Sequence, residues 1–145
     1  FVYCEELALL LPWLPWSGSL PWMRVTVLKL RRMNCCLTAC DGVFDLIALP
    51  GGMPGAAKLR DTEILEGMVK KQAAEDRLYA AICAAPAVAL ASWGLLKGLK
   101  ATCHPSFMEQ LSSCAKATES RVQQDGKVLT SRGAGTAMEF LCCTG

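Results

Sequence analysis

Short apolar segments that alternate with helix-forming segments are the feature of this chain that most limits its fold. Residues 43–49 (VFDLIAL) and 78–82 (LYAAI) are compact apolar runs, and each is followed by glycine or proline and then by a segment with helical character. Such runs are typical of buried strands. Strand–helix alternation favours an α/β sandwich with a mainly parallel sheet. We therefore expect an α/β domain over residues 42–145.

The segments around these two strands predict further elements. Asp61 suits the N-cap of a helix, because apolar residues follow at helical spacing between positions 64 and 69. Pro86 suits the first turn of a second helix, predicted over 86–96. A short strand is expected over 100–103, and a short helix opens at 104–111 (HPSFMEQL).

The last part of the domain predicts a hairpin and a short helix. Asp125–Gly126 separates two alternating runs within 121–131, and a tight turn there needs positive φ values. Thr136 with Glu139 three residues later matches a capping box. The helix that it begins has room for barely two turns before residue 145.

Residues 1–41 have a different character, with Trp-Pro repeats, clustered cysteines and no clear period. The apolar stretch 1–22 lacks a basic start, contains Glu5 and Glu6, and is interrupted by Pro12, Pro15 and Pro21. Proline prevents a helix long enough to cross a bilayer, so we expect neither a signal peptide nor a membrane span. We expect 1–41 to be a divergent and poorly folded segment, within which only 24–30 (RVTVLKL) resembles a strand.

The cysteines and charges limit the classes of partner. Nine cysteines, an odd number with no CxxC pair, argue against a disulfide framework or a zinc ribbon and favour reduced thiols inside a cell. Cys35, Cys36 and Cys40 are the alternative, as part of a metal cluster, but the chain has one histidine and no second ligand pair. The net charge of +2 argues neither for nor against a nucleic-acid partner, and the basic run 29–32 (KLRR) is typical of a solvated face. We expect no metal, no nucleic-acid partner and no membrane partner. Cytoplasm is the expected compartment, with a plastid as the alternative if a transit peptide precedes Phe1.

Four residues at predicted strand ends form a candidate reactive site. Cys83 falls where the strand 78–82 turns into a helix, and unpaired N–H groups and the helix dipole at such a joint favour thiolate over thiol. Gly51 and Gly52 follow the neighbouring strand and offer backbone N–H groups of the kind that an oxyanion hole needs. His104 follows the next short strand and is able to take or give a proton. The plainer alternatives are a small core cysteine, an ordinary glycine turn and a structural histidine.

These segments carry a family resemblance. FDLIALPGG, AAICAAPA, ATCHPSFM and SRVQQDGKVLTSRGAGTAMEF are similar to successive signatures of the ThiJ/PfpI superfamily, in its DJ-1 branch of parkinsonism-associated deglycases, and most of all in plant-type members. The resemblance covers about residues 42–140, with the four motifs in order and at the family's intervals.

The resemblance implies a flavodoxin-like fold and a set of functional residues. Cys83 would be the nucleophile in a strained strand-to-helix turn, and His104 the histidine beside it. Gly51, Gly52 and Ala84 would line the oxyanion and substrate side, and Arg132 would help form an anion-binding spot. Ala84 stands where the superfamily's peptidases have histidine, so a peptidase is disfavoured.

The resemblance also implies a range of activities. The family includes cofactor-free glyoxalases that convert methylglyoxal to lactate, proposed deglycases, redox sensors whose cysteine oxidises to sulfinate, and holding chaperones. Its members are commonly homodimers. We expect no cofactor and a small dicarbonyl substrate, with redox sensing or chaperone-like action through Cys83 oxidation as the alternative.

The N-terminal region departs from the family pattern. The family has a catalytic glutamate near its start, in a loop of the form G-x-E-E-x-E, and only 3–16 (YCEELALLLPWLPW) is similar here. If Glu5 and Glu6 match the first two acids, the catalytic position falls on Ala8, and Glu6 takes the role only in a shifted register. We expect a sheet incomplete at the N-terminus, a short final helix, weakened catalysis and a compromised dimer face. A nonfunctional fragment is the third alternative.

Overall fold

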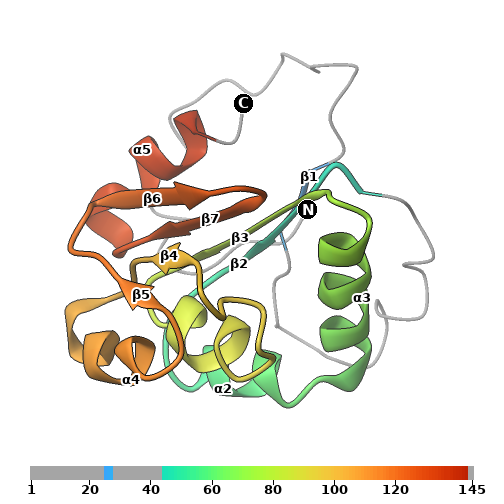
Figure 1. The fold of residues 1–145 in the computed structure, drawn as a ribbon, viewed down its shortest axis with the longest axis horizontal. Helices are drawn as coiled ribbons and strands as arrows, with labels where there is room; N and C mark the ends of the chain where they lie inside the picture. Colours follow the sequence, from blue (N-terminus) through green and yellow to red (C-terminus); the bar gives the residue numbers. More distant parts are fainter. Residues whose placement is uncertain (1–24, 28–43, 144–145) are drawn as a thin grey trace.

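The computed structural model describes residues 25–27 and 44–143 (Figure 1). Five strands form one sheet in the order β1-β2-β3-β7-β6. They are β1 (Val25–Val27), β2 (Leu46–Leu49), β3 (Leu78–Ile82), β7 (Val128–Ser131) and β6 (Val122–Asp125). The first four run parallel, and β6 is antiparallel to β7. The expected α/β fold with a mainly parallel sheet is therefore confirmed.

Helices lie on both faces of this sheet. Around one face lie α2 (Gly55–Arg60), α3 (Glu63–Ala74), η2 (Pro86–Leu90) and α4 (Met108–Ser112), and α5 (Ala137–Cys142) covers the other (Figure 1). The shorter elements are β4 (Lys100–Ala101), η3 (Pro105–Phe107), β5 (Lys116–Ala117) and η4 (Ala134–Thr136), with β4 and β5 paired as a small second sheet.

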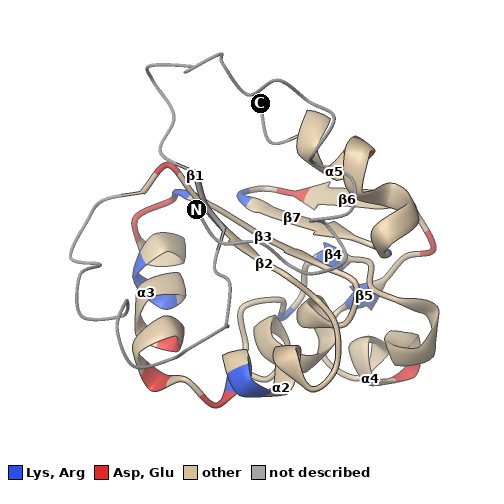
Figure 2. Cartoon of the chain, turned by 180° about the vertical axis from the view of Figure 1, so that it is seen from behind, with Lys and Arg blue, Asp and Glu red and all other residues tan. Residues whose placement is uncertain are grey.

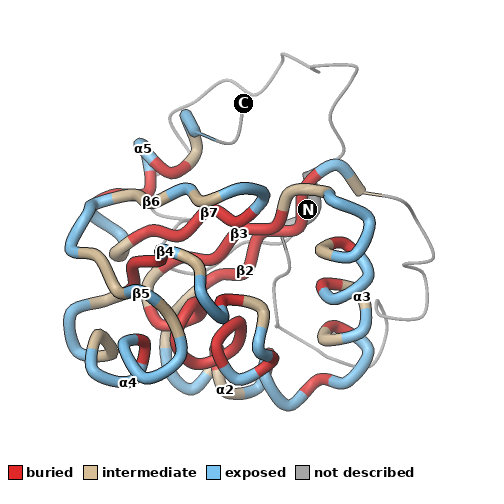
Figure 3. The backbone as a smooth tube through the Cα atoms, viewed as in Figure 1, coloured by how far each residue is buried: buried red, intermediate tan, exposed pale blue. Residues whose placement is uncertain are grey.

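The core follows the two faces of the central strands. Along β2, Ile47 and Leu49 pack with the α2–α4 side, whereas Leu46 and Ala48 pack with Phe140 of α5. This alternation is the period of two that an extended strand imposes. Figure 3 shows β2, β7 and all but the start of β3 buried. Figure 2 shows these three strands without charged residues, which lie on helices, loops and the strands β4, β5 and β6 instead. The apolar runs in the sequence therefore become the centre of the molecule.

The first predicted helix differs from the structure in how it begins. The Asp61 N–H donates to Ala57 O and so ends α2, a helix that the sequence did not predict, and its carboxylate accepts from Arg60 Nε at 2.7 Å. Thr62 occupies the N-cap position of α3 instead. Its hydroxyl donates back to Lys58 O. The prediction of Asp61 as N-cap is wrong because its backbone and side chain are already engaged by α2.

The segment after Pro86 is helical but wider than an α-helix. Ala91 N donates to Pro86 O and Leu95 N donates to Leu90 O, each across five residues, which is the π pattern. Trp93 N keeps an ordinary four-residue step to Ala89 O. The predicted start at Pro86 is confirmed, whereas the helix ends at Leu90 instead of at 96 and continues as turns, and its type was not predicted.

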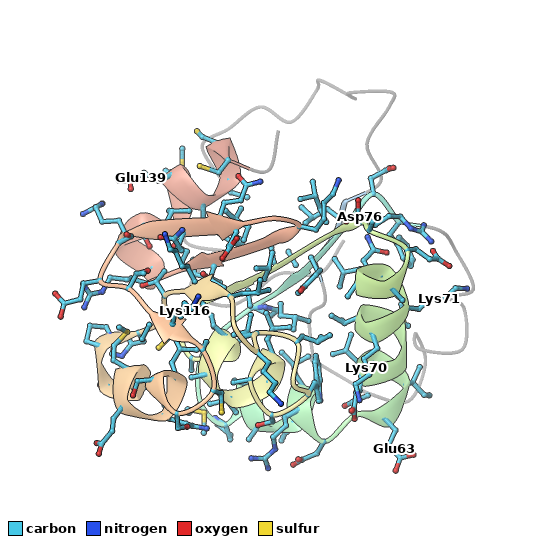
Figure 4. All side chains as sticks on the ribbon, viewed as in Figure 1. Glu63, Lys70, Lys71, Asp76, Lys116 and Glu139 are labelled. Atoms are coloured by element: carbon cyan, nitrogen blue, oxygen red, sulfur yellow. The ribbon has the colours of Figure 1, made fainter. Side chains whose placement is uncertain are left out.

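The hairpin is confirmed, and the capping box is wrong. Asp125 pairs with Val128, so the two-residue loop is Gly126 and Lys127, with φ of +60° at the glycine. The Thr136 hydroxyl bonds back to the preceding loop and makes no cap on α5. Glu139 instead accepts both Arg121 Nε contacts, at 2.9 and 3.0 Å. Figure 4 places Glu139 on α5.

Several expectations fall outside the described residues. These include Glu5, Glu6, Ala8 and the cysteines at positions 4, 35, 36 and 40. The boundary at residue 41 stays a prediction, although β1 of the segment 24–30 does form a strand. Within 25–27 and 44–143, no helix combines the length and apolar character that a membrane crossing requires. The same residues hold no group of three or more His, Cys, Asp or Glu side chains placed to bind a metal.

Candidate active site

Three neighbouring parallel strands, β2, β3 and β7, end at the same edge of the sheet, and the residues that follow each strand lie close together there. Gly51 follows β2, Cys83 follows β3 directly, and Arg132 follows β7 directly. The carboxyl ends of parallel strands are where open α/β sheets bind ligands. The sequence-based expectation that Gly51 and Cys83 converge if their strands are neighbours is therefore met.

Cys83 occupies a strained backbone conformation. Its φ is 65°, in the left-handed region that residues with a Cβ rarely adopt. Its amide donates to Ser131 O at 2.9 Å, which extends the β3–β7 ladder, and its carbonyl accepts from His104 N at 2.8 Å. Ala84 O then accepts from Val88 N and begins the helical turns. The bonds on both sides hold the cysteine at the joint, half-buried.

Gly51 packs directly against this joint. A Cβ placed on Gly51 would lie 2.4 Å from Cys83 Cβ, 2.7 Å from Ile82 O and 3.1 Å from Ala84 N. Side-chain carbons do not approach at such distances, so only glycine fits here. The first glycine of PGG is thus required by contact with the cysteine turn.

Gly52 serves a different purpose. Its φ is +86°, and nothing lies within 4 Å of the Cβ position. Its carbonyl accepts from Ala56 N at 2.8 Å at the start of α2. Gly52 therefore reverses the chain between β2 and α2, and the oxyanion role expected for Gly51, Gly52 and Ala84 stays a prediction.

The His104 backbone is bonded to the cysteine turn, and its ring is held in place by neighbouring residues. Besides the bond from its amide to Cys83 O, its Nδ1 accepts from Ser106 N at 3.3 Å. Phe107 meets the ring edge-on at 6.4 Å between centroids. Because Nδ1 is an acceptor, the neutral ring carries its proton on Nε2. The Cδ2 atom of the ring lies near Gly133, 3.7 Å from the position that a Cβ on this glycine would take.

Arg132 brings a positive charge to the same edge. Its amide donates to Arg121 O at 3.0 Å, and its Nη1 donates to Glu119 O at 3.1 Å. The guanidinium is close enough to the Cys103 thiol to lower that thiol's pKa. Arg132 thus carries its charge at the end of β7, next to β3, whereas its position beside the Cys83 sulfur and its binding of an anion stay predictions.

Cys103 is a residue of this region that the sequence-based reasoning did not single out. It is fully buried, with its Sγ 3.4 Å from His104 O and 3.6 Å from Met108 Sδ. Burial raises the pKa of the Cys103 thiol to about 11; the charge of Arg132 opposes this rise and Cys83 adds to it. The sequence did offer one indication that Cys103 lies near the site: it precedes His104 directly in ATCHP, at the end of a predicted strand. A thiol with this pKa is protonated at neutral pH and therefore a poor nucleophile.

Comparison with known proteins agrees with the geometry. A profile described as the DJ-1/PfpI family matches residues 30–143. Protein DJ-1 homolog B of Arabidopsis thaliana is 63% identical over 100 residues, which are 69% of this chain and 23% of that protein. Glutathione-independent glyoxalase DJR-1.2 of Caenorhabditis elegans is 37% identical over 98 residues, which cover 67% of this chain and 51% of that protein.

A solved structure gives the same result for the fold. Oxidized DJ-1 of Toxoplasma gondii superposes with a TM-score of 0.67 and 44% sequence identity, over 72% of this chain and 56% of that one. The chain thus spans about a quarter of the Arabidopsis protein and about half of the other two. Its similarity to a plant protein is consistent with the plant-type branch that the motifs indicate. Strand-end geometry, sequence profile and superposition agree, and the chain belongs to the DJ-1/PfpI family.

Proposed function

We propose that the chain is a cysteine-dependent, cofactor-free protein that acts on methylglyoxal-type dicarbonyls as a glyoxalase or deglycase. The observation that carries the proposal is the position of Cys83: a turn with φ of 65°, in contact with Gly51 and bonded to the His104 amide. Strain of this kind persists where the surroundings enforce it, and it is concentrated at functional sites. Similarity to a protein named as a glutathione-independent glyoxalase supports the same chemistry.

The proposed reaction begins with addition to the aldehyde. The Cys83 thiolate forms a C–S bond to the aldehyde carbon, and the carbonyl π pair moves to the oxygen, giving a hemithioacetal oxyanion. Backbone N–H groups around Gly51, Gly52 and Ala84 are the proposed donors to that oxyanion. His104 Nε2–H is a further proposed hydrogen-bond donor to that oxyanion, because the Nδ1 of the neutral ring already accepts from Ser106 N–H. The oxyanion then takes its proton from solvent water, which gives the hemithioacetal hydroxyl.

The second half needs a base. It takes the proton from the former aldehyde carbon and returns it to the former ketone carbon, while the proton of the hemithioacetal hydroxyl passes to the former ketone oxygen, which leaves a lactoyl thioester. Water then cleaves the thioester to lactate and restores the thiolate. Glu6 is the carboxylate proposed for this step, and with Ala8 at the position that matches the family's glutamate we expect slow turnover.

The test is D-lactate formation from methylglyoxal by the purified chain. We expect slow turnover that Cys83→Ala abolishes, that Glu6→Gln lowers further, and that Cys114→Ala leaves unchanged because Cys114 is exposed and lies outside this site. Methylglyoxal should also slow alkylation of Cys83 and not of Cys114. Turnover that survives Cys83→Ala would overturn the proposal.

A second candidate function is redox sensing, with chaperone-like action, through the same thiol. Two peroxide molecules convert a thiolate to a sulfinate with release of two waters. Of the thiols near the site, Cys83 is half-buried, whereas Cys103 is fully buried and holds its proton. Addition of two oxygens at Cys83 under mild peroxide, in a chain that forms no lactate, would favour this function. If peroxide oxidised other cysteines and left Cys83 unmodified, redox sensing through Cys83 would be excluded.

A further inference from the structure

Thr136 ends the loop over residues 131–136, which we name the Arg132 loop, and its hydroxyl bonds to Ser131 and Gly133 at the start of that loop. Thr136 Oγ1 lies 2.6 Å from Ser131 Oγ, accepts from Gly133 N at 3.1 Å and donates to Gly133 O at 2.9 Å. Ser131 is 0% exposed and Thr136 is 7% exposed. At this depth a lost hydroxyl partner is not readily replaced by solvent, so these bonds fix the loop from inside.

The hydrogens available indicate the direction of the bonds. Ser131 Oγ also lies 3.3 Å from Arg121 O. Two hydroxyl hydrogens serve three contacts, because each hydroxyl donates once. The shorter distances favour Ser131 donating to Thr136, and Thr136 donating to Gly133 O. Thr136 is then the hydroxyl through which both Ser131 and Gly133 are held.

The two residues that Thr136 holds are bonded to the Cys83 backbone and lie beside the His104 ring, respectively. Ser131 O accepts from Cys83 N at 2.9 Å. Gly133 faces the His104 ring, with its Cβ position 3.7 Å from Cδ2. Arg132 lies between them in the chain. A shift of the loop therefore moves the cysteine turn, the wall beside the histidine and the guanidinium together.

We propose that Thr136 is a positioning residue for the Cys83 site, acting through Ser131 and Gly133 without touching the reacting atoms. The proposal rests on the proposed function in one respect, that Cys83 is the reactive thiol. It also gives a role to a threonine that the sequence analysis assigned to capping the final helix, because the Thr136 side chain makes no cap on α5 and bonds to Gly133 at the start of η4 instead.

The experiment measures alkylation of Cys83 by iodoacetamide, residue by residue in mass spectra, from about pH 5 to pH 9, together with D-lactate formation. Thr136→Val keeps the shape and removes the hydroxyl. We expect its Cys83 rate constant at neutral pH to fall about tenfold, because small misplacements of reacting groups have large kinetic effects. We also expect the rise of rate with pH to move to higher pH. Thr136→Ser, which keeps the hydroxyl, should stay within about twofold of the unchanged chain.

The matched control is Thr62→Val. Thr62 is also buried, and its hydroxyl also donates to a backbone carbonyl, Lys58 O at 2.7 Å, but between α2 and α3. Its variant should lose stability without changing the Cys83 rate or pH profile. Equal effects of Thr136→Val and Thr62→Val, or no effect of Thr136→Val, would overturn the proposal.

A second variant covers the case in which Thr136→Val does not fold. Ser131→Ala removes one hydroxyl and leaves the bonds between Thr136 and Gly133, so we expect a smaller loss of Cys83 reactivity in the same direction. An unchanged rate in Ser131→Ala would then reject the positioning role. Lack of lactate in the unchanged chain would reject the glyoxalase proposal, while the alkylation measurements would still decide the role of Thr136.

Discussion

At the scale of single residues, the cysteine turn depends on one contact and one backbone angle. The sequence predicted Cys83, Gly51 and His104 as neighbours, because each follows a strand and carries a chemically distinctive group. It did not predict that Cys83 leaves no room for a side chain at Gly51, because the distance between the two residues depends on how β2 and β3 pair. Nor did the reasoning from sequence single out Cys103: its position beside His104 places it near the site, but its full burial is visible only in the structure.

Gly51→Ala should disrupt the site. The new methyl group would sit 2.4 Å from Cys83 Cβ, so the turn must move, and we expect a loss of about 1 to 3 kcal/mol in unfolding free energy with slower alkylation of Cys83. Gly67→Ala is the control, because its Cβ meets nothing within 4 Å in the middle of α3. The control should be neutral or more stable by up to about 1 kcal/mol in denaturant unfolding. Equal stability of the two variants would contradict the contact.

The strain at Cys83 is measurable with two substitutions at that position. Both Cys83→Ala and Cys83→Gly remove the sulfur, but only glycine relaxes a φ of 65°. We expect Cys83→Gly to be more stable than Cys83→Ala by about 1 kcal/mol in urea unfolding, despite the greater chain entropy of unfolded glycine. If alanine proved the more stable of the two, the left-handed conformation would be refuted.

At the scale of elements, the strands were more predictable than the ends of helices. Buried strands are recognisable in the sequence as apolar runs, and the Asp125–Gly126 pair predicts the hairpin. Helix ends were harder to predict, because a capping side chain can bond to other partners. The Asp61 carboxylate accepts from Arg60 at the end of α2, and the Thr136 hydroxyl accepts from Gly133 N in the Arg132 loop. The sequence predicted the helical start at Pro86 but not the π hydrogen bonds that follow it.

Gln72 offers a test of how an element is fixed to the sheet. This α3 residue is 3% exposed, and its Nε2 donates to Phe44 O at 2.9 Å and to Leu78 O at 3.0 Å, near the starts of β2 and β3. Gln72→Leu leaves both carbonyls without this donor, so we expect a loss of about 1 to 3 kcal/mol in unfolding free energy. Lys71→Leu, at an exposed neighbour, should change it by less than about 0.5 kcal/mol. A Gln72→Leu protein as stable as the Lys71→Leu control would argue against the bridge.

At the scale of the whole molecule, the parallel β2-β3-β7 order brings separate motifs to one edge. The sequence predicted the α/β class and the family, since four ordered motifs carry both. It gave no basis for the structure of residues 1–24, and the carboxylate expected near Cys83 belongs to that segment.

The buried Cys103 thiol should make stability depend on alkaline pH. Its pKa is raised by burial from an ordinary 9.0 to about 11, so between these values the unfolded chain loses a proton that the folded chain keeps. The contribution of Cys103 to the unfolding free energy should therefore be constant below about pH 9 and should fall by roughly 1.4 kcal/mol per pH unit between about pH 9 and pH 11. Burial also raises the pKa of Tyr79, which adds its own fall at higher pH.

Cys103→Ala separates the two groups. The variant loses packing at every pH, but its stability should decline less steeply than that of the unchanged chain between about pH 9 and pH 11 in urea titrations. Parallel pH curves for the two proteins would show that the thiol is not buried as described.

The most direct test of a reactive Cys83 is the order in which the thiols of the folded chain react. Cys114, Cys142 and Cys143 are exposed, whereas Cys83 is only partly accessible, so exposure alone ranks Cys83 behind them. Limiting iodoacetamide near pH 7, read by residue-resolved mass spectrometry, should instead label Cys83 first, about tenfold faster than Cys114, with the advantage lost in urea. Labelling in order of exposure, or an advantage that persists in urea, would contradict a cysteine activated by its turn.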